Sequence, residues 1–177
     1  MSPVETPTLR LERWTVTSGS NVQSRGAVFL GSGDHHWEGA AEGNGPVDAL
    51  YRAVDAALEA VLAGSPRLIA YDVHAVAEGP DSEALVTVKI APPTSAAGGR
   101  ATGRHTGTSR NANIIAASIE AYIEAVNQLL GEAHWQGAAE AAGDRRREKA
   151  AAPVTAPRRA ELDEDAGEHD TTSWFER

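Results

Sequence analysis

The sequence predicts an α+β domain made of two pseudo-symmetric βββα units in a layered sheet–helix sandwich, followed by a disordered C-terminal tail. Three short strand-like segments precede an amphipathic helix that begins near residue 46, and the same order recurs about 60 residues later. Each unit would present one sheet face and one helix stripe that can bury each other. At 177 residues the chain is long enough for one such domain and a tail.

The first unit begins with alternating apolar and polar residues at positions 9–17, the period of a strand with one buried face. A short apolar run at 25–31 and a segment at 37–42 are interpreted as the next two strands. The helix follows from Pro46, and Gly64 and Pro66 end it. Its apolar residues recur at spacings of 3, 4, 4 and 3 and share one face: Val47, Leu50, Val54, Leu58 and Val61.

The second unit repeats this order. Residues 68–77 and 83–90 are predicted strands, and the second of them alternates cleanly between apolar and polar side chains. A flexible loop at 92–99 leads to a third predicted strand at 100–107. A wide apolar stripe predicts a second long helix over residues 113–130.

The predicted α+β domain spans residues 9–131. Residues 132–152 are rich in alanine and charged residues, which predicts an extra helix that buries little apolar surface. Residues 153–177 form the predicted disordered acidic tail, with seven Asp and Glu between Glu161 and Glu176. The terminal pair Trp174-Phe175 is interpreted either as a short docking motif or as having no role.

The composition narrows the possible partners. The net charge is −9, and the basic run at residues 145–147 is interpreted as a solvated helix face because Asp144 and Glu148 flank it, so we expect no nucleic-acid partner. The chain has no cysteine, which excludes disulfides and thiolate metal sites. It has no signal-like N-terminus and no apolar run of roughly 20 residues, so we expect a soluble cytoplasmic protein without membrane contact.

The sequence Gly43-Asn44-Gly45-Pro46 leads directly into the first helix. Asn44 is predicted to cap the free N–H groups, and Pro46 suits the first helical turn. Such a helix start attracts anions, including carboxylates. The alternative is a well-capped helix with no ligand. Asp48 is interpreted either as stabilising the partial positive charge of the helix start or as contacting a ligand ammonium group.

Two motifs carry a resemblance to a known family. The first is Gly43-Asn44-Gly45-Pro46-Val47-Asp48-Ala49-Leu50, and the second is Asn113-Ile114-Ile115-Ala116-Ala117-Ser118. In this order they resemble the C-terminal allosteric domain of 2-isopropylmalate synthase, a leucine-biosynthesis enzyme, which citramalate synthases share. The resemblance covers roughly residues 9–131.

The resemblance implies a dimerising pair of βββα units that binds a branched-chain amino acid, leucine or isoleucine, near the helix starts at the dimer interface. Binding inhibits a separate catalytic barrel. The motif match implies these ligand-binding residues: Asn44, Gly45, Pro46, Asp48, Ala49, Asn113, Ile114, Ala117 and Ser118. Ser118 also has a simpler interpretation, as a small residue that lets helices pack closely.

Two further residues are possible ligand contacts. Arg110 departs from the family pattern before the second helix, and its guanidinium would either strengthen carboxylate binding or select a different ligand. His105, on the preceding predicted strand, is placed beside the pocket. His35 and His36 are interpreted as part of a polar turn rather than a metal site, because neighbours on an extended chain face opposite ways.

The sequence therefore suggests a stand-alone amino-acid-binding regulatory domain, dimeric and non-catalytic, with no cofactor and no metal. Eight residues precede Leu9, whereas the family's catalytic barrel needs several hundred, so we expect any synthase to be a separate subunit. The alternative is a dimeric scaffold or assembly subunit that has lost its ligand. A new enzyme activity is disfavoured because no general base has a positioned partner.

Overall fold

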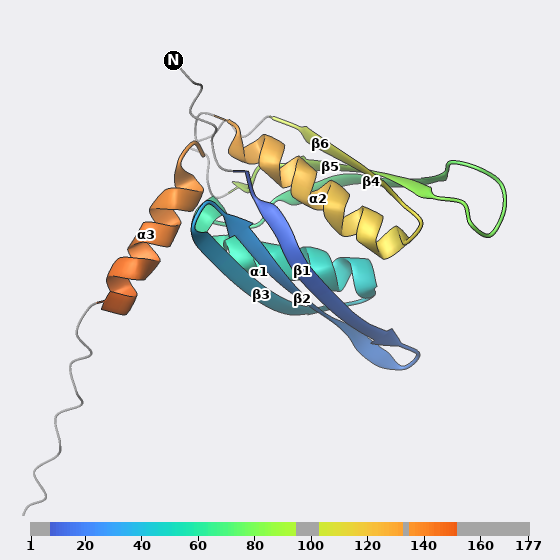
Figure 1. The fold of residues 1–177 in the computed structure, drawn as a ribbon, viewed down its shortest axis with the longest axis horizontal. Coiled ribbons are helices and arrows are strands. Elements are labelled where there is room, and N and C mark those ends of the chain that lie inside the picture. The colour runs from blue at the N-terminus through green and yellow to red at the C-terminus, as the bar shows by residue number, and fades with distance from the viewer. Residues whose placement is uncertain (1–7, 95–102, 133–134, 152–177) are drawn as a thin grey trace, which may run out of the picture.

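The computed structural model describes residues 8–94, 103–132 and 135–151, and it contains two three-stranded antiparallel sheets, each followed by a helix (Figure 1). The first sheet has the strand order β1-β2-β3 and the second β4-β5-β6. The element bounds are β1 Arg10–Gly19, β2 Val22–Ser32, β3 His35–Gly43, α1 Pro46–Leu62, β4 Arg67–Ala75, β5 Ala84–Ala91, β6 His105–Asn111, α2 Ile114–Leu130 and α3 Ala138–Ala151. The predicted βββα order, repeated once, is confirmed.

The two units share one irregularity of their sheets. The β1–β2 register shifts between Leu11 and Arg13, and the β4–β5 register shifts between Leu68 and Ala70. Just after these shifts, Trp14 lies opposite Val28 in one unit, and Tyr71 lies opposite Val88 in the other. A β-bulge at the same place in both first strands shows that the repeat is structural and extends beyond the order of the elements.

A glycine in the third strand of each unit lets the helix approach the sheet closely. A Cβ atom on Gly39 would overlap the carbonyl oxygen of Ala53 in α1. A Cβ atom on Gly107 would overlap the carbonyl oxygen of Ala121 in α2. Each glycine therefore occupies a position where no side chain fits between strand and helix.

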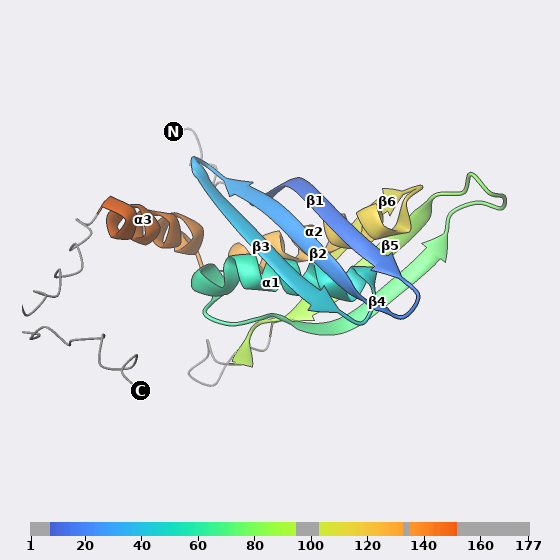
Figure 2. The ribbon, with the colours of Figure 1, turned by 90° about the horizontal axis from the view of Figure 1, so that it is seen from below.

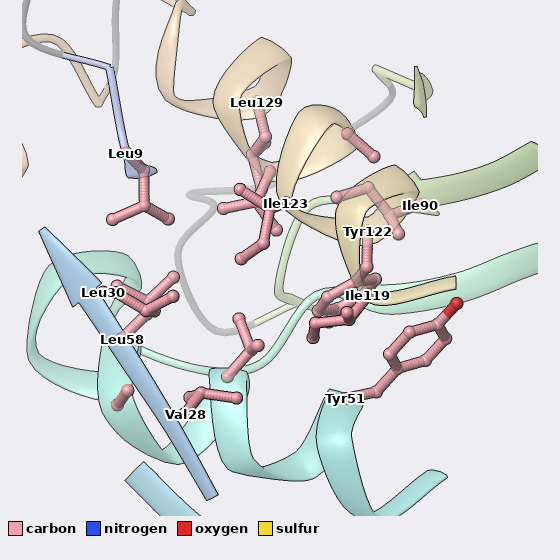
Figure 3. Packing of buried hydrophobic residues seen from close by; sticks show 14 of the residues in the cluster. Leu9, Val28, Leu30, Tyr51, Leu58, Ile90, Ile119, Tyr122, Ile123 and Leu129 are labelled. Carbon is pink, nitrogen blue, oxygen red and sulfur yellow. The ribbon is translucent and has the colours of Figure 1, made fainter. Parts of the chain in front are cut away.

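One hydrophobic core joins the two units. α1 packs on β2 and β3, whereas α2 packs on β5 and β6. The two helices lie alongside each other between the sheets (Figures 1 and 2). Figure 3 shows side chains from both units meeting at this contact, among them Leu30, Leu58, Ile119 and Ile123. Both units thus contribute side chains to the hydrophobic core that holds the layered sheet–helix arrangement together.

The third strand of the second unit was misplaced by the sequence prediction. The predicted strand covered residues 100–107, but β6 begins at His105 and ends at Asn111. Gly107 was interpreted as the end of the strand, whereas it lies inside β6 beneath α2. Residues 95–102, which include the start of the predicted strand, lie outside the described residues.

The extra helix predicted within 132–152 is present as α3, Ala138–Ala151. The predicted disordered tail, 153–177, lies outside the described residues. Among the helices that are described, none is long and apolar enough to span a membrane.

Candidate ligand site at the helix starts

The start of α1 is open to a ligand. Its N-cap is Gly45, an extended residue with φ −160° and ψ 173°, and Pro46 occupies the first turn. Within the described residues, no side chain accepts a hydrogen bond from the first N–H groups of this helix. These groups and their partial positive charge remain available to an anion.

The prediction that Asn44 caps α1 is wrong, because Asn44 lies one position before the N-cap. Its backbone N–H instead donates to Oδ2 of Asp48 at 2.9 Å. Arg52 donates from Nε to both oxygens of the same carboxylate, at 3.1 and 3.0 Å. The Asn44 N–H, with a smaller effect of Arg52, lowers the pKa of Asp48. Asp48 therefore stays ionised and closes the turn before the helix.

Ala49 is fully buried, although it belongs to the predicted site. A Cβ atom on Gly43 would lie 2.5 Å from the Ala49 nitrogen, and one on Gly26 would lie 2.9 Å from the Ala49 carbonyl carbon. The first glycine of the motif thus permits the close approach of α1 to its own sheet. Ala49 makes this contact and has no surface left for a ligand.

The start of α2 is capped. The side-chain oxygen of Asn113 accepts hydrogen bonds from the N–H groups of Ile115 at 3.0 Å and Ala116 at 3.3 Å. Ile114 is 49% exposed at this end, whereas Ala117 and Ser118 are buried. An anion would have to displace a good N-cap to reach the first N–H groups of α2.

The two helices run in parallel, so their starts lie at the same end. Tyr51 Oη donates to the Ser118 carbonyl at 3.1 Å, and Tyr122 Oη donates to Asp55 Oδ1 at 2.5 Å. In each pair the two partners are 67 positions apart in the sequence, so both pairs fit one alignment of α1 with α2. One helical turn earlier, this register places Val47 opposite Ile114.

All three tyrosines of the chain meet where α1, α2 and β4 come together. The rings of Tyr51 and Tyr122 stack with centroids 4.3 Å apart, and Tyr71 meets Tyr51 edge-on at 6.3 Å. The hydroxyl of Tyr71 hydrogen-bonds the Ser118 hydroxyl at 2.8 Å. Sequence reasoning missed this cluster. The available signal was the spacing of Tyr51, which lies four residues after Val47 and three before Val54 on the first helix.

A groove of about 600 Å³ runs beside α1 toward the start of β4. Its lining includes the predicted residue Asp48 together with Tyr51, Asp55, Leu68 and Tyr122. Burial raises the pKa of Asp55 to about 6, although the hydrogen bond from Tyr122 opposes this rise. The groove thus combines apolar and aromatic surface with one carboxylate that is costly to ionise.

The Asp55 carboxylate should reduce stability at neutral pH. Its pKa in the folded protein, about 6, exceeds the ordinary value of 3.8, so the folded state favours the protonated form. The free energy of unfolding should therefore fall as the pH rises from about 4 to about 6. Asp55→Asn removes the charge and can still accept the Tyr122 hydrogen bond. We expect it to stabilise the protein by about 1 to 3 kcal/mol at pH 7.5 and by much less at pH 4.

Urea denaturation of both proteins at the two pH values measures this difference. Glu59→Gln, which removes an exposed carboxylate from the same groove, is the matched control and should change little at either pH. An Asp55→Asn protein destabilised equally at both pH values would contradict the argument.

The two further candidate residues, Arg110 and His105, do not contribute to the open start of α1. Arg110 forms an ion pair with Glu83, and its side chain is 58% exposed. His105 Nε2 lies 2.6 Å from Oε1 of Glu132, just beyond the end of α2. Because α2 runs back along β6, the beginning of the strand faces the end of the helix. His105, a possible ligand contact, therefore lies near the end of α2 and not at the helix starts.

The two adjacent histidines face different parts of the molecule. His35 is buried and its Nε2 lies 3.4 Å from Oδ1 of Asp144 in α3, whereas the exposed His36 lies 3.2 Å from Glu12 in β1. Among the described residues, no group of three or more His, Asp or Glu side chains is placed to hold a metal ion.

Two βββα units with parallel helices and one open helix start define a pseudo-twofold α+β domain with a candidate anion site. The chain belongs to the LeuA allosteric (dimerisation) domain family, whose model matches residues 3–130. The resemblance noted in the sequence is confirmed.

Relatives place this domain within longer proteins. The chain is 36% identical over 126 residues to a 2-isopropylmalate synthase of Salinibacter ruber, a match that covers 71% of this chain and 21% of the relative. It is 39% identical over 129 residues to a putative (R)-citramalate synthase of Methanoculleus marisnigri, covering 73% and 24%. The chain thus spans about a quarter or less of these relatives, and the shared part is the allosteric domain.

Proposed function

We propose that this chain is a non-catalytic regulatory domain that binds a branched-chain amino acid at the start of α1. The observation that carries this proposal is the open N-cap at Gly45, whose helix N–H groups suit a carboxylate. Asp48, ionised at the mouth of the groove, is the partner for the ligand ammonium group. Val47 and Ile114, opposite each other in the helix register, offer apolar surface for a branched side chain.

The proposed site is asymmetric. Asn113 occupies the N–H groups of α2, and Arg110 is paired with Glu83, so the second motif does not supply a second open helix start. Ala117 and Ser118 support the site from within the core, where Ser118 hydrogen-bonds Tyr71. The amino acid therefore binds mainly to the first unit, and the second unit closes one side.

Amino-acid binding should raise the melting temperature. A ligand at 100 times its dissociation constant stabilises the folded state by about 2.7 kcal/mol. Thermal-shift measurements with leucine, isoleucine and valine test this expectation. The proposal fails if none of the three, and no related 2-amino or 2-keto acid, changes the melting temperature.

Gly45 offers a matched pair of variants for this assay. A Cβ atom at Gly45 has no atom within 4 Å, and the backbone there is extended, so both replacements fit. Gly45→Asp places a carboxylate where it can cap α1 and compete with the ligand carboxylate. We expect this variant to lose the ligand-induced shift while its ligand-free melting temperature is unchanged or higher. Gly45→Ala adds a methyl group without a cap and should keep most of the shift.

We further propose that the domain forms a homodimer through β4, an edge strand. Its large apolar residues are exposed: Leu68 by 50%, Tyr71 by 37% and Val73 by 39%. On β1, the equivalent edge strand, Leu11 and Trp14 pack partly against the core. The name of the matched family includes dimerisation, which supports assigning this uncovered surface to a second copy.

The alternative function is a dimeric scaffold or assembly subunit without a ligand. The capped α2 start favours it, because one of the two helix starts is already closed. Affinity capture from native extract, combined with the thermal-shift assay, distinguishes the regulatory function from the scaffold function. Recovery of a synthase together with a ligand-induced shift supports regulation of a separate catalytic subunit, whereas recovery without any shift supports the scaffold.

A further inference from the structure

The third helix, α3, lies beyond the family match, which ends at residue 130. It packs on β3 and α1, at the side of the domain where β3 begins and α1 ends. Gly143 sits directly against the ring of His35, so that any side chain at this position would overlap the ring. Ala142 beside it is buried, as is Trp135 ahead of the helix. These contacts hold against the domain a helix whose apolar side chains are all alanines.

A shallow groove of about 360 Å³ lies between α3 and α1. Its apolar surface comes from Trp37 in β3, from Ala57 and Ala60 in α1, and from Ala142 in α3. Its charged lining residues are Arg145, Arg146, Lys149 and Glu38. The groove therefore joins an apolar floor to a rim with a net positive charge.

The cations on the rim are placed to contact an acidic segment that lies in the groove. Arg146 lies over the Trp37 ring, 5.8 Å from its centroid. Arg147, the neighbouring cation of the same run, turns away and donates to the carbonyl of Asp34 at 3.3 Å. Arg145 and Lys149 have no ion pair with any carboxylate of the described residues within 4.0 Å. An acidic partner would therefore gain charge-assisted contacts without first breaking existing ones.

The chain itself contains a segment with the complementary composition. Residues 161–177 carry seven acidic residues and one arginine, and include the adjacent apolar pair Trp174-Phe175. Nine residues, 152–160, separate this segment from the end of α3. When extended, they span up to roughly 30 Å, which exceeds the length of α3 at about 21 Å. The tether can therefore reach any part of the groove.

We propose that residues 161–177 bind in the groove between α1 and α3 of the same chain. The acidic side chains contact Arg145, Arg146 and Lys149, and an aromatic side chain of the Trp174-Phe175 pair covers the alanines of the floor. The proposal is independent of amino-acid binding, because it concerns a different surface.

Paramagnetic relaxation in NMR tests the proposal on the full chain. The chain has no cysteine, so Ser173→Cys creates a single site for a nitroxide label beside Trp174. We expect the label to broaden the backbone amide signals of Ala57, Ala60 and Ala142, and 1 M NaCl to remove most of this broadening. Uniform weak broadening across the domain, or none, would overturn the proposal.

Charge variants show whether the rim is responsible. Arg145→Gln, Arg146→Gln and Lys149→Gln in one chain should abolish the broadening in the groove. The matched control replaces three exposed cations elsewhere with glutamine: Arg67, Lys89 and Arg104. It should leave the broadening intact. Equal loss in both triple variants would contradict specific docking.

A mixed sample separates the tail's own chain from a second copy. Chains enriched in ¹⁵N that carry no nitroxide are mixed with nitroxide-labelled chains that contain ¹⁴N, under conditions that allow subunit exchange. We expect the ¹⁵N signals of the groove to remain sharp in this sample. Broadening there would mean that the tail docks on another copy, and this outcome would overturn the intramolecular proposal.

Discussion

Val73→Asp is expected to convert the proposed homodimer into a monomer at micromolar concentration. Val73 lies opposite Val86 in the antiparallel sheet, so its side chain points to the same face as buried residues of β5. Symmetry would bury two new carboxylates in one interface. The dissociation constant should rise at least 100-fold, which corresponds to about 2.7 kcal/mol. Sedimentation over a concentration series measures the change.

Val22 supplies the matched control for this experiment. It is 61% exposed, more than Val73 at 39%, but it lies where β1 turns into β2. Val22→Asp should leave the dissociation constant unchanged. Both variants should keep the circular dichroism of the wild type, since neither side chain belongs to the core. If the wild type and both variants all sediment as dimers, β4 is not the interface.

Gly107→Ala is expected to destabilise the domain more than any other single methyl addition considered. The new Cβ atom would overlap the carbonyl oxygen of Ala121 and lie 2.5 Å from the backbone nitrogen of Ala125. Both atoms belong to the helix backbone, so neither can move without displacing α2 from β6. Overpacking of this kind costs about 1 to 3 kcal/mol and sometimes more, and we expect at least about 3 kcal/mol here.

Urea denaturation of Gly107→Ala beside Gly45→Ala measures this cost. The two variants add the same methyl group, but Gly45 has open space around it, so its cost should stay below about 1 kcal/mol. Gly39→Ala should resemble Gly107→Ala, because Gly39 meets α1 as Gly107 meets α2. A Gly107→Ala protein within 1 kcal/mol of the wild type would refute the close-packing argument.

The fold was largely predictable because the apolar patterns of the strands and helices repeat in the same order. What the patterns could not reveal was where a helix lies directly on a strand. The predicted strand ended at Gly107 and was therefore placed too early. The actual role of Gly107 depends on Ala121, which lies fourteen residues later and becomes a neighbour only in three dimensions.

The candidate site was predicted less well than the fold. The motif correctly marked the start of α1, but it included residues such as Ala49 and Ala117 that pack inside the core. Asn44 was expected to cap the helix and instead closes a turn through Asp48. Asp55 and Tyr122 were missed because their hydrogen bond joins helices from different units, and no local pattern encodes that register.

The parallel arrangement of α1 and α2 has an electrostatic consequence. The dipoles of two antiparallel neighbouring helices cancel, whereas the dipoles of two parallel helices add, as they do here. Each helix contributes roughly half a positive charge at its start and half a negative charge at its end. Neither α1 nor α2 has a basic residue in its last turn, and the cations of α3 lie beside the end of α1. The domain is thus polarised along its helices, with one end that attracts carboxylates and another whose negative charge α3 offsets.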